Sequence, residues 1–429
     1  MRVALAAYGT RGDVQPIVCL GRALAERGHE VEVLAPRNEV GMVEAAGLCS
    51  HALPLDFQAM LRAEPAQRML ADGRINALFR WLAGQEEGYD SALRQTLAAT
   101  AESVDLIVCT AALVPRCRAV AEAHGIAMVP LHFAPPHSSR MRPAFALSTR
   151  DLGPLNRASH RLFIYAWWRA QRGFLAPLHS ELGLPSPTYS RLWRDYNGQF
   201  PALLGYSPTL LAPPADWPEH LHTVGCLTPS PELRAEIAES GLSVELEDWL
   251  ASGPPPVYLG FGSMPVLNEA AMLRTIRAAL ATLGVRGILA AGWSELGGGG
   301  DDNLYVVDQV DHESLLPRCS AAVHAGGAGT TAASAAAGTP TLICSVWWDQ
   351  PLWGARCREL GIGDSFPFTK LDTRRLVEGL RTVLRPEVAL RAKAVARRMA
   401  EEDGVASAVA RVEQGCFEHL GQHGRGALA

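Results

Sequence analysis

The chain has 429 residues, more than a single hydrophobic core usually serves, so two domains are expected. Its formal net charge of −5 argues against nucleic acid or an anionic membrane as the main partner. The nine cysteines form no C-x-x-C pair or metal-ligand spacing, which favours reduced thiols. The apolar N-terminal run is too short for a signal peptide, and no stretch reaches the roughly 18 apolar residues of a membrane span. We therefore expect a cytoplasmic protein without stable membrane insertion.

The first half of the chain alternates buried strands with amphipathic helices. Residues 3–8 form a continuous apolar run, a helical stripe follows, and a second apolar run occupies 31–34. This order is typical of a strand–helix–strand unit whose sheet is buried on both faces. The signal recurs at 106–109 and 128–131, with a helix expected over 115–124. The pattern predicts a doubly wound parallel sheet.

Two segments of the first half, 53–101 and 135–199, are less regular and rich in aromatic residues and methionine. Excursions at strand ends often build ligand pockets, although most of these side chains are expected to belong to the core. The residues concerned are Phe57, Met60, Phe79, Trp81, Met141, Phe145, Phe163, Tyr165, Trp167 and Trp168.

Proline-rich stretches at 212–218 and 228–231 indicate a linker, after which a second series of strands and helices begins. Strands are expected at 257–261, 287–291, 304–307, 321–324 and 341–344, with a helix over 270–283 and a final amphipathic helix over 390–420. The expected organisation is a first domain at 1–215, a linker at 216–231, a second domain at 232–400 and a C-terminal helix at 401–429 that packs back on the first domain. Two such domains would form a cleft between the carboxyl ends of their strands.

The most specific motif comprises residues 323–331, Val-His-Ala-Gly-Gly-Ala-Gly-Thr-Thr, which follow an apolar strand and open an alanine-rich helix. Small residues let the backbone approach a ligand, and the N–H groups of a helix N-terminus attract an anion, so the motif predicts a diphosphate site. It matches neither the P-loop nor the G-x-G-x-x-G fingerprint. The alternative, a helix packed tightly on a sheet through small residues, leaves His324 unexplained.

Two shorter motifs add polar groups at strand ends in the second half. Ser263, in the run 260–264, offers a hydroxyl and an N–H to phosphate, although this run could equally form an ordinary turn without a ligand. Asp349 and Gln350 follow an aromatic pair, and a carboxylate beside an amide can bind neighbouring sugar hydroxyls. The alternative for Asp349 is an N-cap with Pro351 in the first helical turn, and both roles could hold together.

In the first half, residues 11–16, Arg-Gly-Asp-Val-Gln-Pro, occupy the first strand–helix turn, which would face the cleft. Asp13 is a candidate N-cap for that helix. Beside an acceptor hydroxyl, a partly desolvated carboxylate at this place could instead serve as a general base. The residues alone leave both roles open.

Together these motifs resemble the nucleotide-sugar glycosyltransferases of the GT-B fold (family 1 type), and they look most like the bacterial natural-product and sterol glucosyltransferase branch. The resemblance covers nearly the whole chain and is most specific over 306–371. It implies an α/β fold of two doubly wound, Rossmann-like parallel-sheet domains facing across a cleft. The first domain would bind the acceptor and the second the nucleotide sugar.

The resemblance also implies roles for single residues. Asp13 would be the catalytic base, His324 would contact the donor diphosphate, and Asp349 and Gln350 would hold the transferred sugar. The donor-binding residues would be Ser263, Gln309, Val310, His324, Gly327, Ala328, Gly329, Thr330, Asp349 and Gln350. Acceptor contacts are expected from Phe79, Trp81, His132, Phe133 and Met141, and no metal ligands are expected.

Three positions depart from the family pattern. Asp311 stands where the family usually has proline, and Trp348 is large where the family is usually small. Ala332 replaces a ribose-binding glutamate of the plant members. These departures bear on the recognition of ribose and of the sugar.

The implied reaction is an inverting hexosyl transfer by a single in-line displacement. The donor would be UDP-glucose or, alternatively, a dTDP-sugar, and the acceptor a hydroxyl of a small apolar molecule, such as an antibiotic-like natural product or a sterol. No cofactor is expected, and the protein would be a monomer or a homodimer. A nucleotide-sugar 2-epimerase and a non-catalytic nucleotide-sugar-binding partner are the alternatives. The aromatic excursions argue against the first, and the presence of Asp13 argues against the second.

Overall fold

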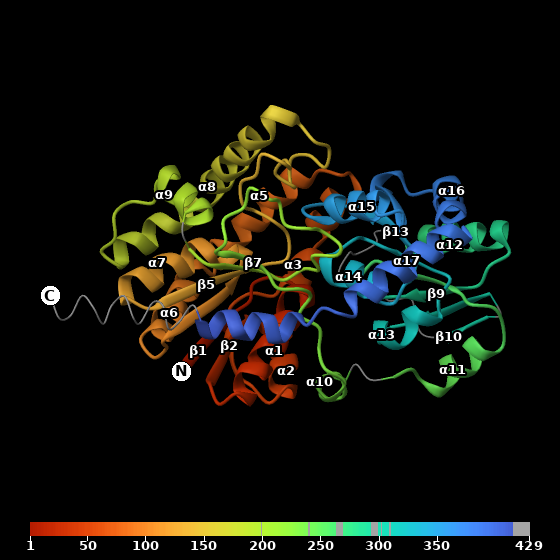
Figure 1. Ribbon diagram of the computed structural model, residues 1–429, viewed down its shortest axis with the longest axis horizontal. Coiled ribbons are helices and arrows are strands. Elements are labelled where there is room, and N and C mark those ends of the chain that lie inside the picture. Colours follow the sequence, from red (N-terminus) through yellow and green to blue (C-terminus); the bar gives the residue numbers. More distant parts are fainter. Residues whose placement is uncertain are drawn as a thin grey trace.

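The computed structural model describes residues 1–198, 200–238, 241–262, 269–292, 299–301, 303–308 and 310–414. Within these residues the chain forms two halves, each built on a seven-stranded sheet with helices on both faces (Figure 1). The prediction of two doubly wound α/β domains is confirmed.

The first sheet has the order β3-β2-β1-β4-β5-β6-β7, and all its neighbouring strands are parallel. Its strands are β1 Arg2–Ala6, β2 Glu30–Pro36, β3 Cys49–Leu53, β4 Leu106–Thr110, β5 Ala127–His132, β6 Ala202–Leu204 and β7 Leu221–Thr223. Successive residues of β1 alternate between two core clusters, so both faces of the sheet are buried.

Helices cover both faces of this sheet. In chain order they are α1 Arg11–Glu26, α2 Val40–Ala45, α3 Phe57–Arg62, α4 Glu64–Ala71, α5 Ile75–Glu86, α6 Asp90–Ala101, α7 Val114–His124, α8 Asn156–Glu181 and α9 Tyr189–Asn197. Apolar side chains of α1 and α2 pack on one face, and those of α6, α7, α8 and α9 pack on the other.

The second sheet repeats this winding. Its order is β10-β11-β9-β8-β12-β13-β14, and only the β10–β11 pair is antiparallel. The strands are β8 Val257–Gly260, β9 Gly287–Ala290, β10 Gly299–Gly300, β11 Leu304–Val307, β12 Ala321–His324, β13 Thr341–Ser345 and β14 Gly363–Pro367. The helices of this half are α11 Val244–Ala251, α12 Glu269–Leu283, α13 His312–Leu315, α14 Ala328–Ala336, α15 Gln350–Glu359, α16 Thr373–Val383 and α17 Pro386–Met399, whereas the preceding helix, α10 Pro231–Glu236, packs on the first half.

The first half extends further along the chain than the sequence predicts. Part of the expected linker, 216–231, is β7, the edge strand of the first sheet, and Leu233 of α10 lies in the core cluster on the α1 face. Helical residues 404–414 contribute Ala408 and Val412 to the same cluster. Because residues 400–403 separate them from α17, the one helix expected over 390–420 is two helices where it is described. Residues 415–429 lie outside the described residues.

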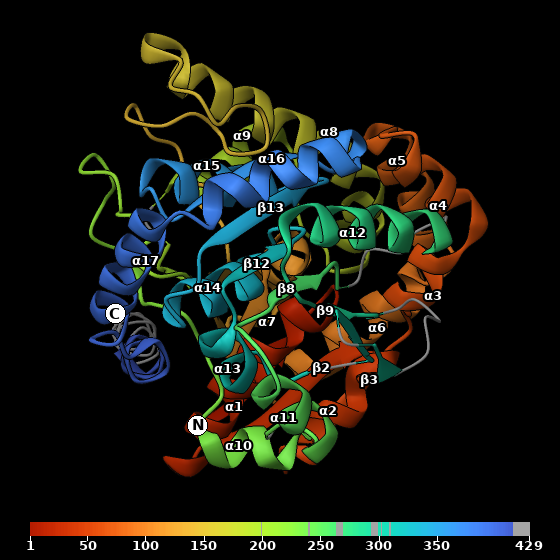
Figure 2. The same cartoon turned by 90° about the vertical axis from the view of Figure 1, so that its right-hand side faces the viewer.

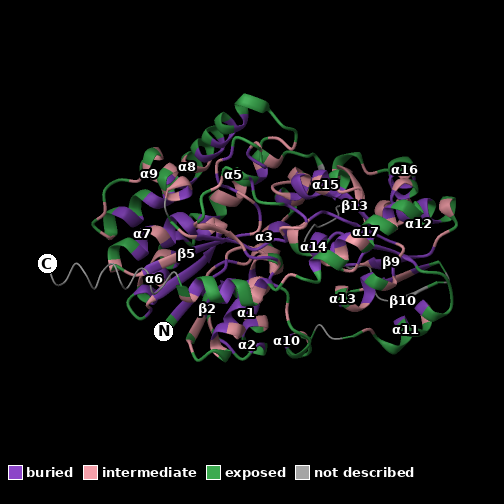
Figure 3. Ribbon diagram, in the orientation of Figure 1, coloured by how far each residue is buried: buried purple, intermediate pink, exposed green. Residues whose placement is uncertain are grey.

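The two halves pack directly against each other. Leu70 and Leu78, from α4 and α5, lie in the core cluster of the second sheet, and Figure 2 shows both helices at the right-hand edge of the molecule. Hydrogen bonds also join the two halves. Arg356 Nε donates to the carbonyl oxygen of Leu210 (2.9 Å), and Ser207 Oγ donates to Glu402 (2.8 Å). Buried residues continue through both sheets (Figure 3).

Two further observations concern helices and thiols. None of the helices in the described ranges has the length and apolar character needed to cross a bilayer. The eight cysteines in the same ranges are free thiols.

Candidate active site

The first turn of α1 fixes the orientation of Asp13. The N-cap is Thr10, so Asp13 is the third residue of the helix and not the N-cap considered from the sequence. Its Oδ2 accepts the N–H of Thr10 (3.0 Å). Gly9 has φ +149°, and a β-carbon there would overlap the Asp13 carboxylate, so this turn requires glycine.

Asp13 lies close enough to Asp349, in the other half of the molecule, for the charge of Asp349 to act on its carboxylate. Desolvation raises the pKa of Asp13 to about 7; the Thr10 N–H lowers it, and the charges of Asp349 and Glu39 raise it. Desolvation likewise raises the pKa of Asp349 to about 6, although the Trp353 indole lowers it. A carboxylate with a pKa close to neutral suits proton abstraction near pH 7.

Asp349 and Gln350 lie at the start of α15. Asp349 is at the N-cap position, but its side chain does not cap the helix, because Oδ2 instead accepts the Trp353 Nε1–H (2.7 Å). Gln350 Oε1 accepts the N–H groups of Val346 (2.7 Å) and Trp347 (3.2 Å), which braces the turn after β13. The amide nitrogen of Gln350 is therefore the end of that side chain that can donate to a ligand.

His324, the last residue of β12, is a buried neutral donor. Its Nδ1 accepts the N–H of Gly326 (3.0 Å), which assigns the ring proton to Nε2. Desolvation, together with the charge of His312, lowers the pKa of His324 to about 3. Within the described residues Nε2 is buried and has no hydrogen-bond partner, so this N–H is available to an acceptor atom of a ligand.

The N-terminus of α14 lies directly after this histidine. No side chain caps the helix at Gly327, and Thr331 is the first residue to donate back, to the Gly327 oxygen (3.0 Å). The N–H groups of residues 328–330 therefore have no intrahelical acceptor. Gly326 has φ +90°, and a β-carbon there would overlap Ile343, so only glycine fits. Together with Nε2 of His324, these N–H groups form an arrangement that suits a phosphate.

Of the predicted donor-binding residues Ser263, Gln309 and Val310, the structure describes Val310. Val310 is half-buried against the core cluster that contains Tyr258 and Ile288. Ser263 and Gln309 lie outside the described residues.

The departure at Asp311 has a structural explanation. Asp311 is the N-cap of α13 and accepts the N–H of Glu313 (3.0 Å) and the hydroxyl of Ser314 (2.6 Å). It also accepts the N–H of Gly241 (3.2 Å). A proline could make none of these contacts.

Trp348, the second departure, lies among aromatic rings of the first half. Its ring centroid is 6.2 Å from that of Phe79, 5.4 Å from Phe145, 6.0 Å from Phe163 and 6.0 Å from Trp167; we call these five residues the aromatic cluster. The backbone of Trp348 has φ +52°, a conformation that bulky residues rarely adopt and that is often found at functional sites. Because Trp348 directly precedes Asp349, the aromatic cluster lies beside that carboxylate.

Only one predicted acceptor contact, Phe79, belongs to the aromatic cluster. Trp81 packs on the core of the second sheet, Phe133 packs on the α1 face of the first sheet, and Met141 is 55% exposed. The aromatic enrichment of 135–199 was the signal for Phe145, Phe163 and Trp167, but it did not indicate which rings converge.

His132, the fifth predicted acceptor contact, belongs to a separate buried group at the end of β5. Its ring centroid is 5.4 Å from that of His137 and 6.0 Å from that of Tyr196. Neither ring nitrogen of His132 has a hydrogen-bond partner among the described residues, and desolvation lowers its pKa to about 3.

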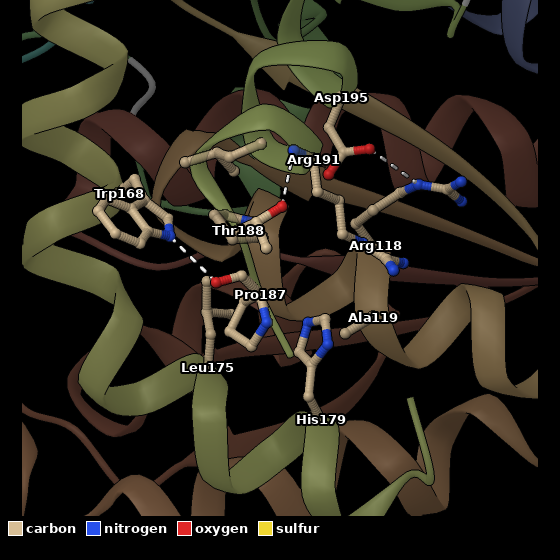
Figure 4. A pocket seen from close by; sticks show the side chains of 11 residues that line it. Arg118, Ala119, Trp168, Leu175, His179, Pro187, Thr188, Arg191 and Asp195 are labelled. Carbon is tan, nitrogen blue, oxygen red and sulfur yellow. Dashed lines mark hydrogen bonds and ion pairs between the residues drawn. The ribbon is translucent and has the colours of Figure 1, made fainter. Parts of the chain in front are cut away.

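A small surface hollow opens between α7, α8 and α9 (Figure 4). Its charged groups are paired with one another: Arg118 Nε lies 3.6 Å from Asp195, and Arg191 forms an ion pair with Glu122. Trp168 Nε1 donates to the carbonyl oxygen of Pro187 (3.2 Å). None of the predicted site residues lines this hollow, so it is not the candidate active site.

The described residues contain no grouping of three or more His, Cys, Asp or Glu side chains that could hold a metal ion. The polar groups that converge at the candidate site are therefore fixed dipoles, one neutral imidazole and two carboxylates.

Comparisons with known proteins agree with this architecture. Residues 3–141 match the model of the glycosyltransferase family 28 N-terminal domain, and residues 293–418 match that of the erythromycin biosynthesis protein CIII-like C-terminal domain. The crystal structure of the glycotransferase of kitacinnamycin has a TM-score of 0.69 at 18% identity and covers 96% of this chain and 98% of its own, which supports the fold.

Three relatives align over almost the whole chain. An uncharacterized glycosyltransferase of Mycobacterium tuberculosis is 34% identical over 421 residues, 96% of this chain and 97% of its own. O-mycaminosyltylonolide 6-deoxyallosyltransferase of Streptomyces fradiae is 34% identical over 96% of this chain and 97% of its own. Sterol 3-beta-glucosyltransferase UGT80A2 of Arabidopsis thaliana is 31% identical over 98% of this chain and 66% of its own. The chain therefore belongs to the glycosyltransferases of the GT-B fold.

Proposed function

We propose that the protein transfers a hexose from a nucleoside diphosphate sugar to a hydroxyl of a small apolar acceptor, with inversion at the anomeric carbon. The observation that carries the proposal is the raised pKa of Asp13, to which desolvation contributes most and the charge of Asp349 from the other half adds. Asp13 has a pKa of about 7 and is influenced by the charge of Asp349, which directly follows Trp348 of the aromatic cluster. A base, a group for the sugar and an apolar surface are thus adjacent.

In this proposal the acceptor oxygen attacks the anomeric carbon while the bond from that carbon to the diphosphate oxygen breaks. Asp13 takes the hydroxyl proton as the new bond forms. Negative charge then grows on the diphosphate. The Nε2–H of His324 and the N–H groups at the start of α14 would stabilise that charge without reorganising. Asp349 and Gln350 would hold the sugar hydroxyls.

UDP-glucose is the first donor that we propose, with a dTDP-sugar as the alternative. The two characterised relatives differ here, since one is named for a 6-deoxyallosyl group and the other for a glucosyl group. Their names give an O-mycaminosyltylonolide and a sterol as acceptors, which supports a natural product or a sterol-like molecule as the acceptor of this chain. The aromatic cluster offers a matching surface.

The first prediction concerns the base. Asp13→Asn retains the contact with the Thr10 N–H but cannot take a proton, so transfer should fall about 10²- to 10⁴-fold while nucleotide affinity changes little. In the wild type, kcat/KM should rise as pH increases through about 7, because Asp13 must be ionised to act. Transfer to a panel of hydroxylated acceptors, followed by mass spectrometry against pH, measures both.

Asp72→Asn, which changes an exposed carboxylate after α4, is the control and should behave as wild type. Near-normal turnover by Asp13→Asn would leave Asp13 a structural residue of the helix turn and would refute the proposed mechanism.

The second prediction concerns the diphosphate. His324→Ala removes a buried donor, so affinity for UDP or dTDP should fall about 10- to 100-fold, as expected for a hydrogen bond to a charged group. Affinity for uridine and thymidine should stay unchanged in calorimetric titrations. The surface variant His51→Ala serves as control. Equal losses for nucleoside and diphosphate would mean that His324 only supports the fold.

The third prediction concerns metals. Fixed N–H dipoles can replace a metal ion at the leaving group, so protein stripped of metal should keep full turnover in excess EDTA. Rates are compared before stripping, after stripping, and after Mg²⁺ or Mn²⁺ is restored. A requirement for either ion would refute this part of the mechanism.

The fourth prediction concerns Trp348. Trp348→Ala removes four ring contacts from the aromatic cluster and should raise the KM for an apolar acceptor about tenfold or more. Trp348→Phe keeps an aromatic ring at this position and should raise that KM less than Trp348→Ala does. The UDP dissociation constant should stay constant in both variants. A parallel loss of UDP affinity would instead assign Trp348 to the donor side.

A further inference from the structure

The outer face of α8 and the loop before it form an unusual surface. Eleven large apolar side chains are exposed among the described residues, and six of them lie between positions 141 and 165. They are Met141, Leu147, Leu152, Leu155, Leu162 and Tyr165. Leu155, the residue directly before α8, is 64% exposed and Leu162 on α8 is 59% exposed, and their spacing of seven residues, about two helical turns, favours the same side. Such a concentration marks an interaction surface.

The same segment is strongly basic. Residues 140–172 contain seven arginines and one acidic residue, Asp151, although the whole chain has a net charge of −5. Arg150, Arg157 and Arg169 are exposed and form no ion pair with the described residues. Their charges are therefore available to a partner. Charge more than about 8 Å away is largely screened at physiological ionic strength, so the acidic remainder of the protein does not cancel this local excess.

The position of α8 leaves this face open. In Figures 1 and 2 the start of α8 is at an extremity of the molecule, and Figure 3 shows its outward side as exposed. The inward side is occupied, because Phe163 and Trp167 belong to the aromatic cluster. One side of this helix therefore contacts the candidate active site, while the other presents apolar and basic groups to the outside.

We propose that residues 140–172 form a docking surface for an anionic lipid membrane. Exposed leucine and tyrosine side chains can enter the boundary between headgroups and acyl chains, while arginines bind the negative headgroups. The arginines would also attract a nucleic acid, but the exposed leucines would make no favourable contact with its charged backbone. An ordinary protein interface would not require such one-sided charge. The surface binds peripherally and involves no membrane-spanning helix.

Membrane docking bears on the acceptor if the proposed function also holds. An acceptor dissolved in the bilayer would be presented on the outer side of α8, and the aromatic cluster lies on its inner side. The docking proposal itself does not depend on transfer, because vesicle binding is measured without a sugar donor.

The test is flotation of the full chain with vesicles of phosphatidylcholine alone or with about one third phosphatidylglycerol. Wild-type protein should float with the anionic vesicles, less so at high salt, and should not float with the neutral ones. Arg157→Gln/Arg169→Gln should lower the partition coefficient about 25-fold, which corresponds to about fivefold for each arginine. Leu155→Ser/Leu162→Ser should lower it about tenfold or more at every salt concentration.

The matched control is Leu390→Ser/Arg397→Glu on α17, which changes an equally exposed leucine and arginine in the second half and should bind as wild type. Equal binding to neutral and anionic vesicles would overturn the proposal, as would unchanged binding by both variants of 140–172. Sedimentation analysis adds a third decisive outcome. If wild-type protein dimerises and Leu155→Ser/Leu162→Ser does not, the face belongs to a second copy of the chain and not to a membrane.

Discussion

The candidate site depends on two half-buried carboxylates, Asp13 and Asp349, placed so that the charge of Asp349 acts on Asp13. The N–H of Thr10 and the indole of Trp353 stabilise the charged forms, but desolvation outweighs them and raises both pKa values. A raised acid pKa means that the folded state binds protons more tightly than the unfolded chain. For Asp13, the resulting decrease in the free energy of unfolding is absent below pH 3.8, the ordinary pKa of the group, and is complete above about pH 7. Proteins commonly retain such destabilising arrangements at functional sites.

The strands were the most predictable part of the fold. The residues expected at 304–307 and 321–324 coincide with β11 and β12, because strands buried on both faces are continuous apolar runs. His324 was predictable for the same reason, since a polar residue that ends such a run must lie at the carboxyl edge of the sheet. The alternation of strands and helices predicted parallel, doubly wound sheets, but it did not predict the order of the strands in either half.

Side-chain roles set by long-range packing could not be predicted. His132 and Phe133 are neighbours in sequence but belong to opposite faces of the first sheet, and only the sheet shows which face meets the second half. Asp349 has the sequence signature of a helix cap, yet its carboxylate binds Trp353 instead. Local patterns likewise could not identify β7 within a proline-rich stretch, because a three-residue edge strand is defined by its partner β6.

Trp348 belongs to the second half but packs against aromatic rings of the first half, including two from α8, and together these rings form one apolar surface. The turn after β13 is braced by Gln350, and this turn holds Trp348 at a positive φ against rings from α5, α8 and the loop before α8. The groups expected to hold the sugar and the rings expected to contact an apolar acceptor are therefore joined by one short segment, 346–350. A movement of either half would displace both at once. Because Phe163 and Trp167 share a helix with the exposed leucines and arginines, a partner that binds the outer face of α8 would act on the same set of contacts.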